Sequence, residues 1–77
     1  MMEEVIVYTT PSCPWCHKTK TYLKEKGISF GEKDVADDSG AAQEMIELTG
    51  QRSVPVIKKG GQYVVGFDPE RLENMLH

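Results

Sequence analysis

The sequence predicts a single α/β domain over residues 1–77, in which three helices cover a four-stranded mixed sheet in the order βαβαββα. Short apolar runs rich in β-branched residues alternate with longer stretches of helical spacing that end at glycine. A chain of 77 residues buries only about 60% of its unfolded surface, which suits one core. The element order implies a parallel strand pair joined by a right-handed crossover, then an antiparallel hairpin, with helices on both sheet faces.

The first half of this pattern begins with residues 5–8, a continuous apolar run typical of a strand that is buried on both faces. A helix is predicted over residues 18–26 and closes at Gly27. Pro14 suits the first helical position, because its fixed φ fits a helix start and it has no N–H to leave unsatisfied. The helix therefore starts just after Cys13.

A second strand is expected from residue 28 toward residue 35, in a partly exposed sheet position because Glu32 and Asp34 interrupt the apolar residues. Residues 37–39 offer N-cap candidates for a second helix over residues 40–49. Its expected inward stripe is Ala42, Met45, Ile46 and Thr49.

The last third predicts a hairpin and a helix. Residues 54–58 and 62–65 pair around a turn at residues 59–61. Asp68 is the expected N-cap of the final helix and Pro69 its first residue. The inward residues of this helix are expected to be Leu72, Met75 and Leu76.

Charge and hydropathy exclude several classes of protein. The net charge of -3, with lysines and acids interspersed, argues against nucleic acid as a partner. Residues 1–4 have neither the basic region nor the apolar run of a signal peptide, and no apolar stretch reaches the roughly 18 residues of a membrane span. We therefore expect a cytoplasmic monomer, in a reducing compartment where paired cysteines are more often catalytic than structural.

The only two cysteines, Cys13 and Cys16, fall where the first strand gives way to the first helix. Unpaired N–H groups and the helix dipole favour an anion at this position, and a thiolate is an anion. The spacing allows a short disulfide, so Cys13 is predicted to attack and Cys16 to resolve the mixed disulfide. Pro14 stiffens the short ring that a Cys13–Cys16 disulfide would close. Trp15 is either an exposed aromatic shelf for a substrate or a packing residue, and the shelf is favoured.

His17 completes a Cys-x-x-Cys-His pattern that also marks covalent haem attachment. That chemistry goes with secreted helical proteins, whereas this chain opens with a buried strand. A zinc site is disfavoured because, besides these three residues, only His77 remains as a further ligand of the same kind. A purely structural disulfide is disfavoured by the short loop. One turn after Cys13, His17 either supports its thiolate by partial positive charge or is a solvated surface residue.

The stretch from Thr9 to His17 resembles the active site of glutaredoxins, whose motif is Cys-Pro-Tyr-Cys with Trp as a close variant of Tyr. The resemblance covers essentially the whole chain and implies the thioredoxin fold. It also implies that Pro55, after Val54, forms a cis peptide facing the cysteines, which leaves the Val54 backbone free to pair with an extended substrate. The implied activity is thiol–disulfide oxidoreduction, with the Cys13–Cys16 disulfide as the redox centre and no bound metal or organic cofactor.

The resemblance departs from the glutathione-dependent pattern at two places. Three residues before the first cysteine, such proteins usually have Lys or Arg to hold a glutathione carboxylate, whereas Thr10 offers only a hydroxyl. Their Gly-Gly pair near the last helix is here Gly66-Phe67. Three further residues remain as candidates for holding glutathione: Asp68, Glu70 and Arg52.

The Gly-Phe-x-Pro stretch from Gly66 is similar instead to the glutaredoxin-like redoxins that serve ribonucleotide reductase and are reduced by thioredoxin reductase. That similarity implies thioredoxin reductase as electron donor and protein disulfides, such as those of ribonucleotide reductase, as acceptors. Two alternatives within the family stay open. One is a glutaredoxin that uses glutathione as co-substrate; the other, disfavoured by the presence of both cysteines, is an iron–sulfur scaffold shared by two copies.

Overall fold

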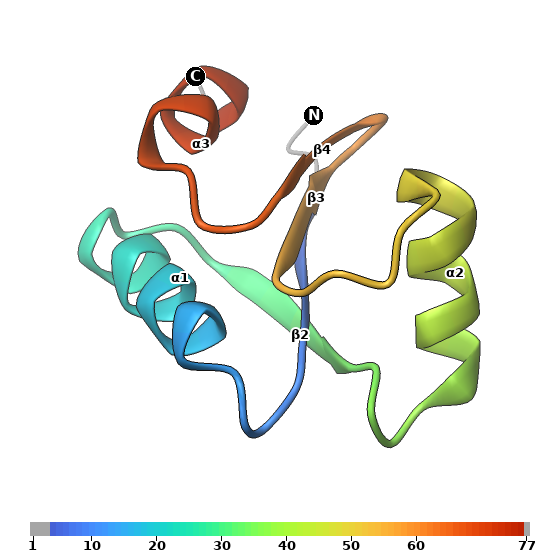
Figure 1. Cartoon of the computed structure of the whole chain (residues 1–77). Coiled ribbons are helices and arrows are strands. Elements are labelled where there is room, and N and C mark those ends of the chain that lie inside the picture. The colour runs from blue at the N-terminus through green and yellow to red at the C-terminus, as the bar shows by residue number, and fades with distance from the viewer. Residues whose placement is uncertain (1–3, 77) are drawn as a thin grey trace.

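The computed structural model describes residues 4–76 and contains the predicted order of strands and helices (Figure 1). The elements are β1 (Val5–Thr9), α1 (Pro14–Glu25), β2 (Phe30–Asp34), α2 (Ser39–Thr49), β3 (Val56–Lys59), β4 (Gln62–Val65) and α3 (Pro69–Leu76). Two strands start later than predicted. β2 begins at Phe30 rather than residue 28, and β3 begins after Pro55, which has no N–H to donate to a strand ladder.

The sheet has the strand order β2-β1-β3-β4, with β1 and β3 in the middle. β1 runs parallel to β2, with Val5 opposite Phe30, and antiparallel to β3, where Tyr8 lies opposite Val56. The parallel pair and the hairpin are therefore as predicted. β1 is also buried along most of its length, whereas β2 occupies a partly exposed edge.

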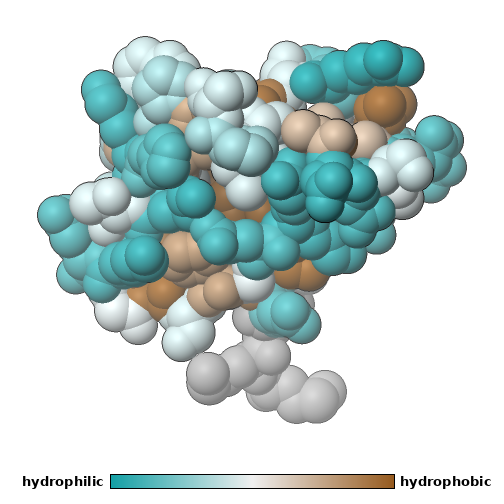
Figure 2. Space-filling model, turned by 90° about the horizontal axis from the view of Figure 1, so that it is seen from below, coloured by the Kyte–Doolittle hydropathy of each residue, from teal (hydrophilic) through white to brown (hydrophobic). Residues whose placement is uncertain are grey.

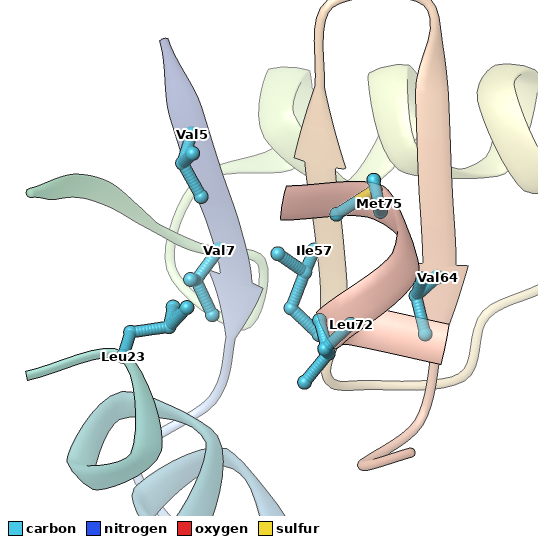
Figure 3. Packing of buried hydrophobic residues seen from close by; sticks show 7 residues of the cluster. All are labelled: Val5, Val7, Leu23, Ile57, Val64, Leu72 and Met75. Atoms are coloured by element: carbon cyan, nitrogen blue, oxygen red, sulfur yellow. The ribbon is translucent and has the colours of Figure 1, made fainter. Parts of the chain in front are cut away.

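Helices α1 and α3 cover one face of the sheet and α2 covers the other (Figure 1). Side chains from β1, β3, β4, α1 and α3 form the larger core on the first face (Figure 3). This cluster consists of Val5, Val7, Leu23, Ile57, Val64, Leu72 and Met75. The inward residues predicted for the last helix are confirmed, because Leu72 and Met75 are buried and Leu76 packs against the cluster.

The α2 face has a smaller core, made of Tyr8, Met45 and Val56. The predicted inward stripe of α2 is confirmed at Met45, which is buried, but the helix is rotated slightly, so that Ala41 rather than Ala42 is the second buried residue. The other predicted members, Ile46 and Thr49, are half-buried. Adjacent alanines at 41 and 42 make either rotation apolar, so hydrophobic spacing alone does not distinguish them.

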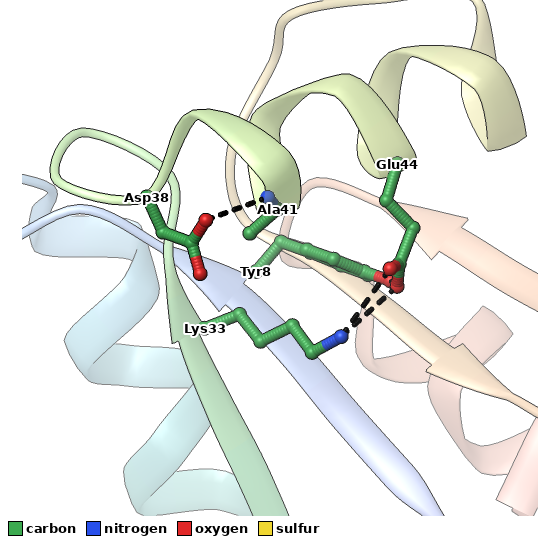
Figure 4. A network of polar contacts seen from close by, with 5 residues as sticks. All are labelled: Tyr8, Lys33, Asp38, Ala41 and Glu44. Atoms are coloured by element: carbon green, nitrogen blue, oxygen red, sulfur yellow. Dashed lines mark hydrogen bonds and ion pairs between the residues drawn. The ribbon is translucent and has the colours of Figure 1, made fainter.

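A polar network joins α2 to the sheet and fixes this rotation (Figure 4). The Tyr8 hydroxyl donates a hydrogen bond to Glu44 Oε1, and Lys33 Nζ lies 3.2 Å from the same oxygen. Burial, followed by the hydrogen bond to Glu44, raises the pKa of Tyr8 well above its ordinary range. The Glu44 carboxylate thus connects α2 to both β1, through Tyr8, and β2, through Lys33.

The ends of α2 follow the sequence prediction. Asp38, one of the predicted N-cap candidates, accepts a hydrogen bond from Ala41 N–H at 3.1 Å (Figure 4). Gly50 ends the helix with a φ of 73°, in the left-handed region that favours glycine. Within residues 4–76, no helix has the length and apolar character needed to cross a membrane.

Candidate active site

Cys13 is the N-cap of α1, in an extended conformation with φ of -95° and ψ of 110°. Its sulfur accepts a hydrogen bond from the backbone N–H of Cys16 at 3.3 Å, and both cysteines are free thiols. Its own N–H is engaged with the Thr10 carbonyl oxygen at 3.3 Å. The partly exposed sulfur therefore takes the place that a Ser or Asp oxygen occupies in an ordinary cap, where the helix favours negative charge.

Cys16 has a different environment, although it lies only three residues further along the chain. Its side chain is 0% exposed and shares the sheet-facing side of α1 with Thr19 and Leu23. Burial raises the pKa of the Cys16 thiol, and a hydrogen bond with Cys13 acts in the same direction. Thr9 and the backbone of Thr10 partly offset this effect. The two sulfurs thus differ in exposure, since Cys13 is partly exposed and Cys16 is fully buried.

The Val54–Pro55 peptide bond is cis, as the resemblance implies. The Val54 carbonyl oxygen lies 4.0 Å from the Cys13 sulfur, so the loop before β3 passes beside the cysteine pair. Pro55 is buried, and its carbonyl oxygen accepts a hydrogen bond from Gly66 N–H at 2.7 Å. The chain segments 54–55 and 66 are thereby linked to each other next to α1.

Trp15 is 54% exposed and stacks against Phe67, with ring centroids 6.3 Å apart. Phe67 in turn makes an edge contact with Tyr22 at 5.9 Å, and Lys18 Nζ lies 4.5 Å from the centre of the Trp15 ring. The large exposed area of Trp15 agrees with the shelf interpretation and not with a core residue. The sequence analysis used Phe67 as a replaced glycine and as part of the Gly-Phe-x-Pro stretch, but it missed the contact of Phe67 with Trp15.

A groove of about 370 Å³ continues from this aromatic pair along α1. It is lined by His17, Lys18, Thr21, Tyr22, Glu25 and Phe67. His17 is exposed, and within residues 4–76 its imidazole makes no hydrogen bond to the Cys13 sulfur. Any support that His17 gives to Cys13 in this geometry would therefore act through charge across one helical turn and not through a hydrogen bond.

The segment before α3 contains two of the candidate acids. Gly66 has a φ of 82°, which places it in the left-handed region. Asp68 caps α3 as predicted, since its Oδ1 accepts a hydrogen bond from Arg71 N–H at 3.2 Å, and its Oδ2 lies 3.5 Å from Arg71 Nε. Its carboxylate is thus already engaged, whereas Glu70 is exposed in the first turn of α3.

Arg52 is exposed and lines a different groove, of about 340 Å³, on the α2 side of the sheet. The other residues that line it are Val35, Ser39, Ala42, Gln43, Met45 and Ile46. Thr10 is half-buried and holds Cys13 through its backbone. The structure thus brings Cys13, Cys16 and Val54 together, with Trp15 and Phe67 at one side, and places Arg52 in a separate groove.

Seen from the end of the molecule that carries the loop between β1 and α1, most of the surface is hydrophilic, with hydrophobic patches between the polar side chains (Figure 2). Among residues 4–76, no group of three or more His, Cys, Asp or Glu side chains could hold a metal ion. The reactive groups that the structure places at this end of the sheet are the two thiols, beside the Trp15 and Phe67 rings.

These features define a small thiol redoxin: a thiol pair where the central strand of a four-stranded mixed sheet gives way to a helix, next to a cis proline. The glutaredoxin family model matches residues 5–64, and the chain belongs to the glutaredoxin family. The family resemblance and the thioredoxin-like fold predicted from the sequence are thus confirmed. Membership indicates thiol–disulfide oxidoreductase activity in general.

Individual relatives agree with this assignment. The chain is 46% identical over 70 residues to a glutaredoxin-like 8.6 kDa protein from the rubredoxin operon of Clostridium pasteurianum, covering 91% of this chain and 93% of that protein. A glutaredoxin structure from Archaeoglobus fulgidus superposes with a TM-score of 0.90 at 28% identity, covering 99% of this chain and 88% of the other. The NrdH-redoxin of Escherichia coli, a glutaredoxin-like protein with a thioredoxin-like activity profile, superposes with a TM-score of 0.82 at 31% identity, covering 96% and 95%.

Proposed function

We propose that the protein reduces protein or mixed disulfides by a dithiol mechanism. The Cys13 thiolate attacks one sulfur of the substrate disulfide, forms a mixed disulfide with it and expels the other substrate sulfur, which takes up a proton. Cys16 then gives up its proton and attacks the Cys13 sulfur. This step forms the Cys13–Cys16 disulfide and releases the second substrate thiol, so two electrons pass from the protein to the substrate.

The difference between the two sulfurs carries this proposal. Cys13 is partly exposed at the N-cap of α1, where the helix dipole favours negative charge, and it can be reached by a substrate. Cys16 is fully buried and donates its backbone N–H to the Cys13 sulfur, so only a group already attached to Cys13 comes within its reach. The Val54 backbone next to Cys13 supports pairing with an extended substrate chain.

Single substitutions test the roles of the two cysteines. We expect Cys13→Ser to abolish thiol transfer, and Cys16→Ser to accumulate a mixed disulfide with the substrate because the second step has no attacking sulfur. Non-reducing mass spectrometry after mixing with a disulfide-bonded protein measures both outcomes. Equal trapping by the two variants would contradict the assigned order of attack.

We further propose that a thioredoxin reductase, supplied with NADPH, returns the Cys13–Cys16 disulfide to the dithiol. Thr10 brings no charge to hold a glutathione carboxylate. Phe67 replaces a glycine of the glutathione-dependent pattern and stacks on Trp15, while Asp68 is engaged by Arg71. The likeness to an NrdH-redoxin with a thioredoxin-like activity profile supports the same donor. The Gly-Phe-x-Pro stretch from Gly66, which is similar to that of redoxins serving ribonucleotide reductase, makes this enzyme the first acceptor to test.

Glutathione is the second candidate donor, because Arg52 is exposed and has no ion-pair partner among residues 4–76. Two coupled assays that follow NADPH consumption distinguish the donors, one with thioredoxin reductase and one with glutathione and glutathione reductase. We expect turnover in the first assay and little in the second. Strong turnover in the second assay alone, lost in Arg52→Ala, would assign glutathione instead. We place the protein in the cytoplasm, because the proposed cycle needs a reducing compartment that returns the disulfide to the dithiol.

A further inference from the structure

The charge of the protein is unevenly distributed along the chain. Residues 14–26, which form α1 and its C-cap, hold four of the nine Lys and Arg residues and only one of the twelve Asp and Glu residues. This segment therefore carries a net charge of +3 in a chain whose total is -3. The helix that presents Cys13 is thus basic, while the remainder of the protein is acidic.

Acidic side chains of the same molecule compensate only part of this positive charge. Lys20 pairs with Glu32 of β2 at 3.1 Å, and Lys26 pairs with Glu73 of α3 at 2.9 Å. Lys18 is exposed, and within residues 4–76 it has no acidic partner. It therefore presents an uncompensated cation beside the active site.

The groove along α1 has a positively charged residue at one end and a negatively charged residue at the other. Lys18 lines the end next to Trp15, Tyr22 and Phe67 provide apolar walls, and Glu25 lines the groove seven residues further along the helix. Seven helical residues rise about 10 Å, which is the length of about three residues of extended chain. The groove thus suits a short peptide segment whose acidic side chain lies at the cysteine end.

We propose that this groove binds an extended segment of a disulfide-bearing protein partner, with an acidic side chain next to the partner's cysteine and an apolar or aromatic side chain further along. The acidic group meets Lys18, and the apolar group packs against Tyr22 and Phe67. Glu25 disfavours a second acidic group at the far end. This assignment rests on the proposed function and adds the partner chemistry that the same site selects.

Disulfide-linked peptide dimers test the exchange. Three sequences are compared, in which the cysteine is followed by Glu and Phe, by Lys and Phe, or by Gln and Phe. The reduced protein is mixed with each dimer at low salt, the reaction is quenched with acid, and the released peptide thiol is measured by chromatography. We expect the Glu peptide to react roughly fivefold faster than the Lys peptide, with a difference that shrinks as salt is added.

Charge reversal at two lysines of α1 separates the groove from the general charge of the helix. Lys18→Glu should remove or invert the preference for the Glu peptide. Lys24→Glu makes the same change of charge on the same helix at a residue that does not line the groove, so it should retain most of the preference. An equal loss in both variants would overturn the proposal, because the preference would then be a property of net charge alone.

Binding without redox chemistry keeps this inference distinct from the proposed function. The same peptides with serine in place of cysteine are titrated into the reduced protein, and amide chemical shifts are followed by NMR. We expect shifts at residues 17, 18, 21, 22 and 25 for the Glu peptide, even if exchange were absent. Exchange at equal rates for all three peptides, with no shifts along α1, would leave the proposed function standing and overturn the docking assignment. Self-association of the wild-type chain that Lys18→Glu abolishes would assign the groove to a second copy instead.

Discussion

The two faces of the sheet are built in different ways. On the α1 and α3 face, a seven-residue cluster of Val, Leu, Ile and Met side chains fills the space below the helices (Figure 3). On the α2 face only three side chains form the buried cluster, and the Tyr8–Glu44–Lys33 network supplies a directional contact (Figure 4). The helix that carries the cysteines thus rests on apolar burial, which is non-directional and does not titrate.

This difference predicts where stability should depend on packing and where it should depend on pH. Apolar burial contributes about 25 cal/mol per Å² at any protonation state. The hydrogen bonds that Tyr8 and Lys33 donate to Glu44 are strongest when the Glu44 carboxylate is ionised. A rim of polar contacts also exists between α1 and α3, where Glu73 accepts from Tyr22 and pairs with Lys26, but it lies outside the apolar cluster.

The largest expected effect is on the α1 and α3 face. Leu23 is 0% exposed, so Leu23→Ala leaves a cavity below α1 and should lower the free energy of unfolding by about 3 kcal/mol. Urea denaturation followed by circular dichroism measures the change. Since Leu23 and Cys16 share the buried side of α1, the variant should also expose the Cys16 thiol to alkylation. If Leu23→Ala lowered the free energy of unfolding by less than about 1 kcal/mol, the core on this face would be loosely packed, contrary to the comparison.

The next effect is expected on the α2 face. Tyr8→Phe keeps the buried ring but removes the donor to Glu44, which retains Lys33 as a partner, so we expect a loss of about 1 kcal/mol. The matched control is Tyr63→Phe on β4, where the ring is 43% exposed and its hydroxyl makes no hydrogen bond within residues 4–76. Equal losses of stability in the two variants would show that the hydrogen bond from Tyr8 to Glu44 does not stabilise the α2 face.

The smallest effect is the pH dependence of the α2 face. The hydrogen bond from Tyr8, followed by that from Lys33, holds the pKa of Glu44 below its ordinary value. The ionised carboxylate therefore stabilises the folded state fully above about pH 4.3, and this contribution is lost as the pH falls through the lower folded-state pKa. Glu44→Gln should flatten the acid side of the stability profile by a few tenths of a kcal/mol, because the group is partly exposed.

Glu47→Gln is the control for this prediction, since Glu47 lies on the same helix and its carboxylate contacts only Gln43 among residues 4–76. Denaturant midpoints between about pH 2 and pH 6 compare the two variants, a range that brackets the ordinary Glu pKa of about 4.3. If the fall of the denaturant midpoint at acid pH were the same in Glu44→Gln as in the wild-type protein, other carboxylates would cause the pH dependence.

Local signals were sufficient to predict the elements and the position of Cys13. Pro14 marks the first helical residue, Asp38 and Asp68 are caps, and Gly27 lies where α1 ends. Each of these depends on backbone preferences within a few residues of the signal. The same reasoning located the cysteine pair at a helix start without any knowledge of tertiary contacts.

Several side-chain contacts between distant segments were not predicted from the sequence. Phe67 meets Trp15 across 52 positions of the chain, and nothing in either local sequence specifies the partner. The rotation of α2 depends on Glu44 reaching Tyr8, a choice that apolar periodicity does not express. Asp68 was predicted both as a helix cap and as a ligand-binding acid. Only the structure shows that both of its carboxylate oxygens contact Arg71 in the cap.

The complete burial of Cys16 has a consequence for the kinetics of the proposed cycle. A sulfur held in the same helical turn as Cys13 acts at an effective molarity far above that of any dissolved thiol. A dissolved thiol must instead reach the mixed disulfide from solution, at the Cys13 sulfur or at the substrate sulfur. In the proposed cycle, the lifetime of the substrate adduct would then be set by the attack of Cys16 and not by the concentration of thiols in solution.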